Sequence, residues 1–198
     1  MTADLLLALV GFAFATSATP GPNNIMLLAS GVNFGFRRTI PHMLGVGLGF
    51  TFMIFVLGLG LSTLFQTYPA AHLTLRYVGG AYMLWLAWKI GTAGAIGPGK
   101  AAALPLTFMQ AALFQWVNPK AWVMAIAAIA SYTVTDFYIP SLAVVCVVFG
   151  LVNIPSIGVW AGFGTAMRRM LDDPKRLRVF NIAMAILLVA SMAPLLLN

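Results

Sequence analysis

Long uninterrupted apolar blocks constrain this chain more than any other feature of its sequence. They occupy approximately residues 5–31, 41–64, 73–91, 106–132, 138–164 and 179–197. A helix needs roughly 20 mostly apolar residues to cross a hydrocarbon core about 30 Å thick. Because lipid offers the backbone no hydrogen-bond partners, an α-helix is the natural form for each block. The pattern predicts an all-α membrane protein with about six transmembrane helices, in a single domain covering residues 1–198.

The charge of the chain supports lipid as its surroundings. Only 8% of the residues are charged, whereas a soluble domain carries roughly a quarter. Nine of the eleven basic residues lie after the first block, at or beyond the end of the third, or after the fifth: Arg37, Arg38, Lys89, Lys100, Arg168, Arg169, Lys175, Arg176 and Arg178. The positive-inside rule places these links in the cytoplasm and both termini outside it. The net charge of +7 therefore reflects topology and does not indicate a nucleic-acid partner.

The two halves of the chain echo each other. Pro20 and Pro119 are 99 residues apart, and so are Pro41 and Pro140. This spacing predicts a duplication with repeats at residues 1–99 and 100–198. A unit of three helices ends on the side opposite to its start, so the second copy would be inserted upside down. Inverted repeats of this kind support alternating access, which favours a transporter.

Two apolar blocks contain residues that break helices. The first holds Thr19-Pro20-Gly21-Pro22-Asn23-Asn24, and the fourth holds Asn118-Pro119-Lys120. A proline inside a helix costs about 3 kcal/mol because it removes a donor and clashes with the preceding turn. Matching interruptions in the two halves of a transporter point to its binding site.

The chemistry of a broken helix suits an amino-acid zwitterion. The restarted helix presents unpaired N–H groups and a positive dipole end to a carboxylate. Freed carbonyls and the side-chain amides can receive an ammonium. An unpaired lysine near mid-membrane costs about 2.5–3.5 kcal/mol, so Lys120 is expected to contact the substrate carboxylate or to act as a charge gate. The predicted substrate-binding residues are Thr19, Pro20, Gly21, Pro22, Asn23, Asn24, Asn118, Pro119 and Lys120. The alternatives are that the prolines only kink helices and that Lys120 reaches the membrane surface.

Two further polar residues are candidates for the transport pathway or for coupling. Asn153 places an amide beside Pro155 in the fifth block. His42 follows Pro41 at the start of the second block and could carry a coupling proton. The sequence favours a solvated histidine at the membrane interface over that role.

Paired glycines indicate close helix contacts. Gly45-x-x-x-Gly49 and Gly158-x-x-x-Gly162 both have the small-residue spacing that lets helices approach each other. Packing is the expected role of both pairs.

Missing residue types argue against an enzyme. The chain has no glutamate, and its four aspartates, two histidines and single cysteine show no metal-ligand spacing. No Gly-x-Ser-Gly nucleophile motif of an intramembrane serine protease is present, and Cys146 alone cannot form an intramolecular disulfide. We expect no catalytic residue, no metal and no cofactor. A small-molecule pore or a membrane assembly subunit stays open as the alternative function, and a homo-oligomer is also left open.

The motifs at the two breaks resemble the signature of the LysE/RhtB family of amino-acid exporters. The resemblance rests on Thr19-Pro20-Gly21-Pro22-Asn23 and Asn118-Pro119-Lys120, and it extends to Gly79-Gly80-Ala81-Tyr82. It implies export of amino acids across the bacterial inner membrane, driven by the proton gradient as an antiporter. Residues 82–90 and 22–25 are most similar to the cysteine/O-acetylserine exporter branch. The shortage of intramembrane carboxylates favours a neutral, zwitterionic substrate over a basic one.

Overall fold

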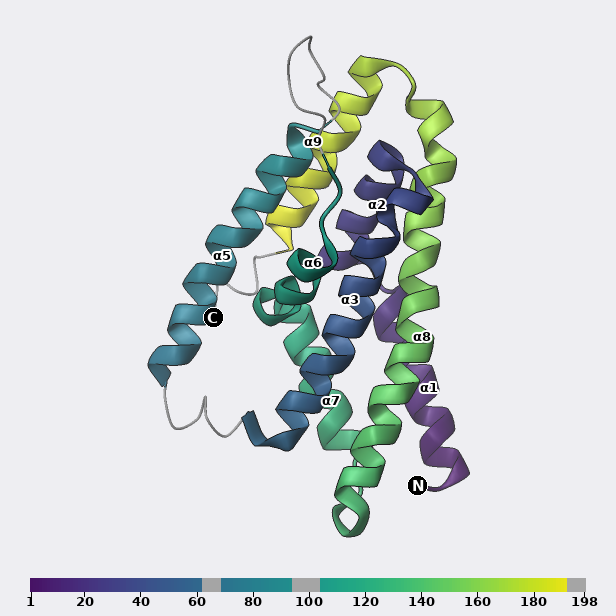
Figure 1. The fold of residues 1–198 in the computed structure, drawn as a ribbon, viewed down its shortest axis with the longest axis vertical. Coiled ribbons are helices and arrows are strands. Elements are labelled where there is room, and N and C mark those ends of the chain that lie inside the picture. Colours follow the sequence, from purple (N-terminus) through teal and green to yellow (C-terminus); the bar gives the residue numbers. More distant parts are fainter. Residues whose placement is uncertain (62–68, 94–103, 192–198) are drawn as a thin grey trace.

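The computed structural model describes residues 1–61, 69–93 and 104–191, and every regular element in these residues is a helix (Figure 1). The elements of the first half are α1 (Ala3–Ala18), α2 (Pro22–Phe34), α3 (Phe36–Val56), η1 (Leu57–Leu61) and α5 (Pro69–Gly91). Those of the second half are α6 (Phe108–Phe114), η2 (Gln115–Val117), α7 (Pro119–Tyr132), η3 (Thr135–Phe137), α8 (Tyr138–Met167), η4 (Arg168–Leu171) and α9 (Pro174–Ala190). The all-α prediction is confirmed for the described residues.

Two helical stretches are long and apolar enough to cross a membrane, Phe36–Gly60 and Thr135–Leu171. The pair formed by α1 and α2 adds a third if it counts as one span bent by 56°. The fourth apolar block is split at Asn118, so α6 and α7 are each shorter than the roughly 20 residues that a span needs. The arrangement of six spans in two inverted repeats stays a prediction, and so does the placement of the termini.

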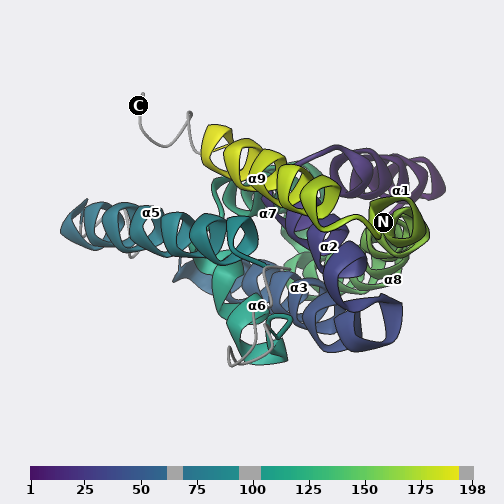
Figure 2. The same ribbon diagram turned by 90° about the horizontal axis from the view of Figure 1, so that it is seen from above.

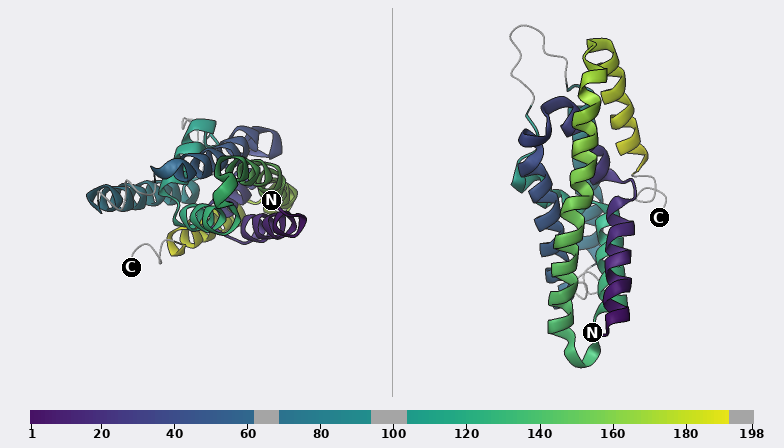
Figure 3. Two further views of the ribbon diagram at one scale, coloured as in Figure 1. Left: turned by 90° about the horizontal axis from the view of Figure 1, so that it is seen from below. Right: turned by 90° about the vertical axis from the view of Figure 1, so that its right-hand side faces the viewer.

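The basic links gather at one end of the molecule. Figure 1 shows the junction of α2 with α3, the end of α5 and the junction of α8 with α9 at its upper end. The N-terminus and the turn that carries Asp136 lie at the opposite end, as the right-hand view of Figure 3 also shows. This grouping matches the separation of charge on which the topology prediction depends.

The long helix α8 packs along α1, α2 and α3. The contact with α2 is close because glycines face it from both sides. A Cβ on Gly31 would lie 2.2 Å from the carbonyl oxygen of Ala161, and a Cβ on Gly164 would lie 2.2 Å from that of Leu28. Neither position can accept a side chain unless α2 and α8 separate.

One of the two predicted glycine pairs packs as expected. Gly45 and Gly49 lie against α6, where a Cβ on Gly49 would come within 2.5 Å of the Ala112 Cα. The prediction for the other pair is wrong. A Cβ on Gly158 would meet only the end of Met43 at 3.2 Å, and Gly162 has no neighbour within 4 Å. The face that α8 turns to α2 instead carries Ala161 and Gly164.

The helices α5 and α9 pack against each other at the edge of the bundle (Figure 2). One end of α5 extends away from the other helices in this view. Large apolar side chains cover the outer surface of α5, and Trp88 is 66% exposed. Lipid is the solvent that such a surface requires.

Candidate substrate site at the two helix breaks

The first break separates α1 from α2. Thr19 and Gly21 both adopt extended backbone conformations, and the helix restarts with Pro22 in its first turn. Proline fits this position because a first-turn N–H has no intrahelical partner. No side chain caps the N-terminus of α2. The interruption predicted for this segment is confirmed.

Side chains of α2 and α8 bind the carbonyls freed at the first break. The side-chain amide of Asn24 donates to the carbonyls of Ser17 and Thr19, each at 3.0 Å. The indole N–H of Trp160 donates to the Ala18 carbonyl at 3.3 Å. These bonds satisfy backbone groups that would otherwise be left without partners. A ligand ammonium would have to compete with these donors for the carbonyls.

Lys120 reaches the first break from the second half of the chain. Its Nζ donates to the Thr19 carbonyl and lies 3.5 Å from the Pro20 carbonyl oxygen. The side chain passes directly over Gly21, where a Cβ would stand 2.6 Å from the Lys120 Cδ. A side chain at position 21 would therefore displace the lysine stem.

The second break separates η2 from α7 at Asn118, whose φ of −88° and ψ of 109° are extended. Pro119 occupies the first turn of the new helix, as Pro22 does in α2. Here the restarted helix is capped, because the Asn118 Oδ1 accepts the backbone N–H of Lys120 at 3.2 Å. This predicted interruption is also confirmed.

A pair of amides joins the two breaks. The Asn23 Nδ2 donates to the Gln115 Oε1 at 2.8 Å, and the Gln115 Nε2 donates back to the Asn23 Oδ1 at 3.2 Å. Gln115 is fully buried, and its Nε2 also donates to the Ala111 carbonyl at 2.8 Å. Gln115 is not among the predicted binding residues, although a polar residue one turn before Asn118 in an apolar block was an available signal.

A small cavity lies between the breaks, lined by residues of α1, α2, α3, α7 and α8. Five of the predicted binding residues line it, namely Gly21, Asn23, Asn24, Asn118 and Lys120. Thr19, Pro20, Pro22 and Pro119 do not line the cavity and instead shape the backbone around it. The space open to the centre of a water-sized molecule is 20 Å³, enough for about one water. The site must widen before it can hold an amino acid.

Asn153 brings an unpaired acceptor to this cavity. Its Nδ2 donates to the Ser17 Oγ at 3.0 Å, and its side chain is 5% exposed. Its Oδ1 is buried and has no hydrogen-bond partner among the described residues. A buried acceptor without a partner is uncommon, so this oxygen is available to a ligand donor or a water.

The charge at the cavity comes from Lys120, and no aspartate or glutamate is among the lining residues. Together with the positive end of the α2 dipole, this favours a carboxylate. It disfavours a ligand with net positive charge, because no anionic group faces the cavity to neutralise it.

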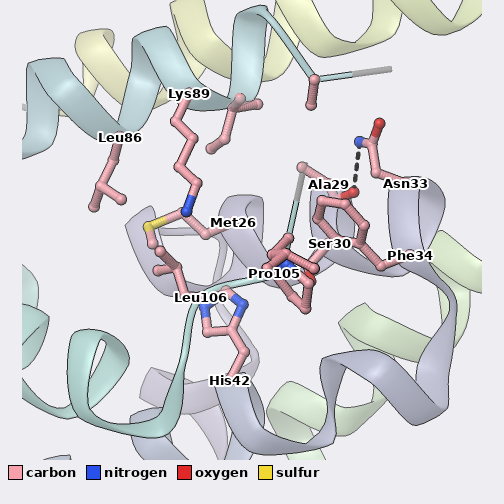
Figure 4. A pocket seen from close by; sticks show the side chains of 13 residues that line it. Met26, Ala29, Ser30, Asn33, Phe34, His42, Leu86, Lys89, Pro105 and Leu106 are labelled. Carbon is pink, nitrogen blue, oxygen red and sulfur yellow. Dashed lines mark hydrogen bonds between the residues drawn. The ribbon is translucent and has the colours of Figure 1, made fainter. Parts of the chain in front are cut away.

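His42 lies elsewhere and is buried, so the expectation of a solvated interfacial histidine is wrong. The helix α3 begins at Phe36, earlier than the predicted start at residue 41, which places His42 in its second turn. The side chain is 1% exposed. It lines a second pocket, between α2, α3 and α5, which also contains Lys89 (Figure 4).

Comparison with known proteins places these features in a family. The family model described as LysE type translocator matches residues 14–197. The cysteine/O-acetylserine efflux protein of Escherichia coli (strain K12) is 34% identical over 191 residues, which cover 96% of each chain. The protein of the same name from Shigella flexneri has the same identity and coverage. No solved structure matches this chain significantly. The chain, with its two broken helices and the cavity between them, belongs to the LysE family of translocators.

Proposed function

We propose that this protein exports small neutral amino acids or related metabolites, of the size of cysteine and O-acetylserine, across the bacterial inner membrane. Membership of the LysE family and the names of the efflux relatives support amino-acid export. The observation that supports a neutral substrate is the composition of the cavity between the breaks. It combines groups for a carboxylate with an acceptor for an ammonium, and lacks an anionic side chain.

The carboxylate binds at the N-terminus of α2. The first-turn N–H groups there have no intrahelical partner, and no side chain caps them. Lys120 stands beside them and adds a positive charge. On binding, its ammonium exchanges the Thr19 carbonyl for the carboxylate, because a charge-assisted bond is stronger than one to a neutral carbonyl.

The ammonium of the same substrate binds the Oδ1 of Asn153. This oxygen lines the cavity and has no partner in the described part of the chain. A zwitterion thereby contacts groups from both halves of the protein, because α2 belongs to the first half while Lys120 and Asn153 belong to the second.

Transport follows from release of the contact that closes the first break. When Lys120 leaves the Thr19 carbonyl, α1 and α2 lose one of the bonds that hold their bend. The site opens to either side in turn by alternating access, in six helices built as two inverted repeats. The proton gradient drives export, because protons enter in exchange for the amino acid.

Counterflow in proteoliposomes tests this proposal. Purified protein is reconstituted with unlabelled O-acetylserine inside, and entry of labelled O-acetylserine is measured at increasing external concentration. We expect saturable entry. The variant Lys120→Met removes the charge but keeps the apolar stem, and loss of one charged hydrogen bond of about 1.5–3 kcal/mol lowers transport at low substrate concentration at least tenfold. The matched control Lys175→Met alters an exposed lysine at the start of α9 and leaves transport unchanged.

Two results would contradict the proposal. Flux that rises linearly with concentration indicates a pore, which is the alternative function. Equal transport by the Lys120→Met and Lys175→Met variants removes Lys120 from the substrate site.

A further inference from the structure

The pocket around His42 is separate from the cavity at the breaks. It lies between α2, α3, α5 and the segment at residues 104–106, at the end of the molecule that carries the basic links (Figures 1 and 4). The space open to the centre of a water-sized molecule is 50 Å³, room for roughly three waters. A carboxylate group fits in such a volume.

His42 is buried in this pocket without protein partners. Both of its ring nitrogens are shielded from solvent and make no hydrogen bond with any described residue. A neutral imidazole carries one N–H donor and one acceptor nitrogen, and leaving both unmade is costly in a buried place. A ligand in the pocket that the ring lines could supply the missing partner.

Lys89 faces the same pocket from the last turn of α5. Figure 4 shows its side chain pointing into the pocket, while the His42 ring faces it from α3. The Lys89 Nζ lies 5.3 Å from the centre of the Trp85 ring, a cation–π contact that leaves its hydrogen-bonding capacity free for a ligand.

The donor groups of the other polar side chains at the pocket are already used in hydrogen bonds within the protein. Both amide hydrogens of Asn33 are used, by the Ala29 carbonyl at 2.8 Å and the Asn181 Oδ1 at 2.7 Å. The Thr39 hydroxyl donates to the Gly35 carbonyl at 2.9 Å, so the hydroxyl of Ser30, 2.9 Å away, must donate to Thr39. Among these side chains, donors for a ligand are left on Lys89 and His42 alone.

The remaining walls are apolar, with Met26, Leu86, Ile90 and Leu106 around the two nitrogen groups. No aspartate or glutamate lines the pocket. Two donors, a positive charge and apolar walls match a small organic anion with a short carbon chain. The exposed Arg37 and Arg38 at the start of α3 raise the local concentration of anions near this end of the molecule.

We propose that this pocket is a second ligand site, which binds the carboxylate of a small organic acid between Lys89 and His42. At the basic end of the protein it acts as the station where the substrate carboxylate first binds before it moves along α2 to the break. The role as an entry station rests on the export function proposed above, whereas the capacity to bind a carboxylate does not.

Butyrate and butyramide form the probe pair, because they share a carbon chain and differ in charge. Tryptophan fluorescence of the purified protein is followed as each is added at constant ionic strength. We expect a saturable change with butyrate, since the anion draws Lys89 away from Trp85, and none with butyramide. The variant Trp85→Phe should lose the signal while equilibrium dialysis with labelled butyrate still reports binding.

Variants then locate the bound anion by dialysis. Lys89→Met and His42→Phe should each raise the Kd for butyrate at least tenfold. His42→Gln should recover most of the affinity, because its amide can donate one hydrogen bond. Lys175→Met should bind like the wild type. Thermal melting and size-exclusion profiles of each variant show whether it is folded. If His42→Phe does not fold, the comparison of His42→Gln with Lys89→Met still tests the proposal.

Three outcomes would overturn the proposal. Butyramide could change the signal as butyrate does, folded Lys89→Met could bind as tightly as the wild type, or Lys120→Met could abolish binding. The last result would place butyrate in the cavity at the breaks.

Counterflow of O-acetylserine by the same preparations separates this inference from the proposed function. Counterflow without butyrate binding removes the second site and leaves the export function standing. Butyrate binding without counterflow contradicts export and retains an anion site. With both present, Lys89→Met should raise the KM for entry from the basic side at least threefold with an unchanged maximal rate.

Discussion

The two helix breaks have the same proline in the same first-turn position, yet their surroundings differ. At the second break, Asn118 caps the restarted helix with its own side chain. At the first, α2 has no side-chain cap, and Lys120 and Asn24 reach in to bind the carbonyls before it. The second break is therefore closed by its own cap, while the first depends in part on Lys120, which comes from the second half of the chain. A ligand can replace a partner from elsewhere more easily than a cap built into the chain, so the first break is the better binding site.

Removing Asn24 should have the largest effect on stability. Asn24→Ala leaves the buried Ser17 carbonyl without its donor and takes one of two donors from Thr19. We expect a loss of about 2–3 kcal/mol in the free energy of unfolding, measured by denaturation in detergent micelles. Asn33→Ala, which alters a buried amide pair far from the breaks, is the comparison for a general loss of an asparagine. If Asn24→Ala were as stable as the wild type, the bonds that Asn24 donates to these carbonyls would not stabilise the first break.

Removing the cap at the second break should cost less. Asn118→Ala removes one N-cap hydrogen bond, worth about 1 kcal/mol. Asn118→Ser should restore most of that loss, because serine is also a good N-cap residue. Denaturation of the three proteins under one condition measures the difference. A larger loss for Asn118→Ala than for Asn24→Ala would reverse the contrast drawn between the breaks.

The smallest effect is expected at Gly21. Its extended backbone allows any residue, so Gly21→Ala introduces no backbone strain, but the new Cβ displaces the Lys120 stem. We expect the KM for counterflow to rise about threefold, or roughly 0.7 kcal/mol, with little change in melting temperature. Gly162→Ala serves as the control, because no atom lies within 4 Å of the added carbon. Identical KM values for the two variants would show that the position of Lys120 over Gly21 does not matter for binding.

Local chemistry explains which parts of the structure were predictable. The breaks at Pro22 and Pro119 could be predicted because proline acts on its own turn of helix, whatever surrounds it. The hydrogen bonds between Asn23 and Gln115 could not, because the two amides lie 92 residues apart and meet only in the folded chain.

Helix rotation and helix starts account for the wrong predictions. Gly158 and Gly162 have the expected spacing, but they lie on another face of α8. The face that α8 presents to α2 carries Ala161 and Gly164. Pro41 predicts a helix start, which would place His42 at the membrane surface. The chain begins α3 at Phe36 and carries the proline within the helix, which moves His42 inward.

The close approach of α2 and α8 at Gly31 and Gly164 also limits how the protein can change shape. With main chains this close, sliding or tilting between α2 and α8 would force atoms to collide, so the two should move as one rigid body. The extended residues between Ala18 and Pro22 then join this pair to α1, whose own packing along α8 must loosen before α1 can move. Loss of the Lys120 bond to the Thr19 carbonyl would act first on this junction between α1 and α2.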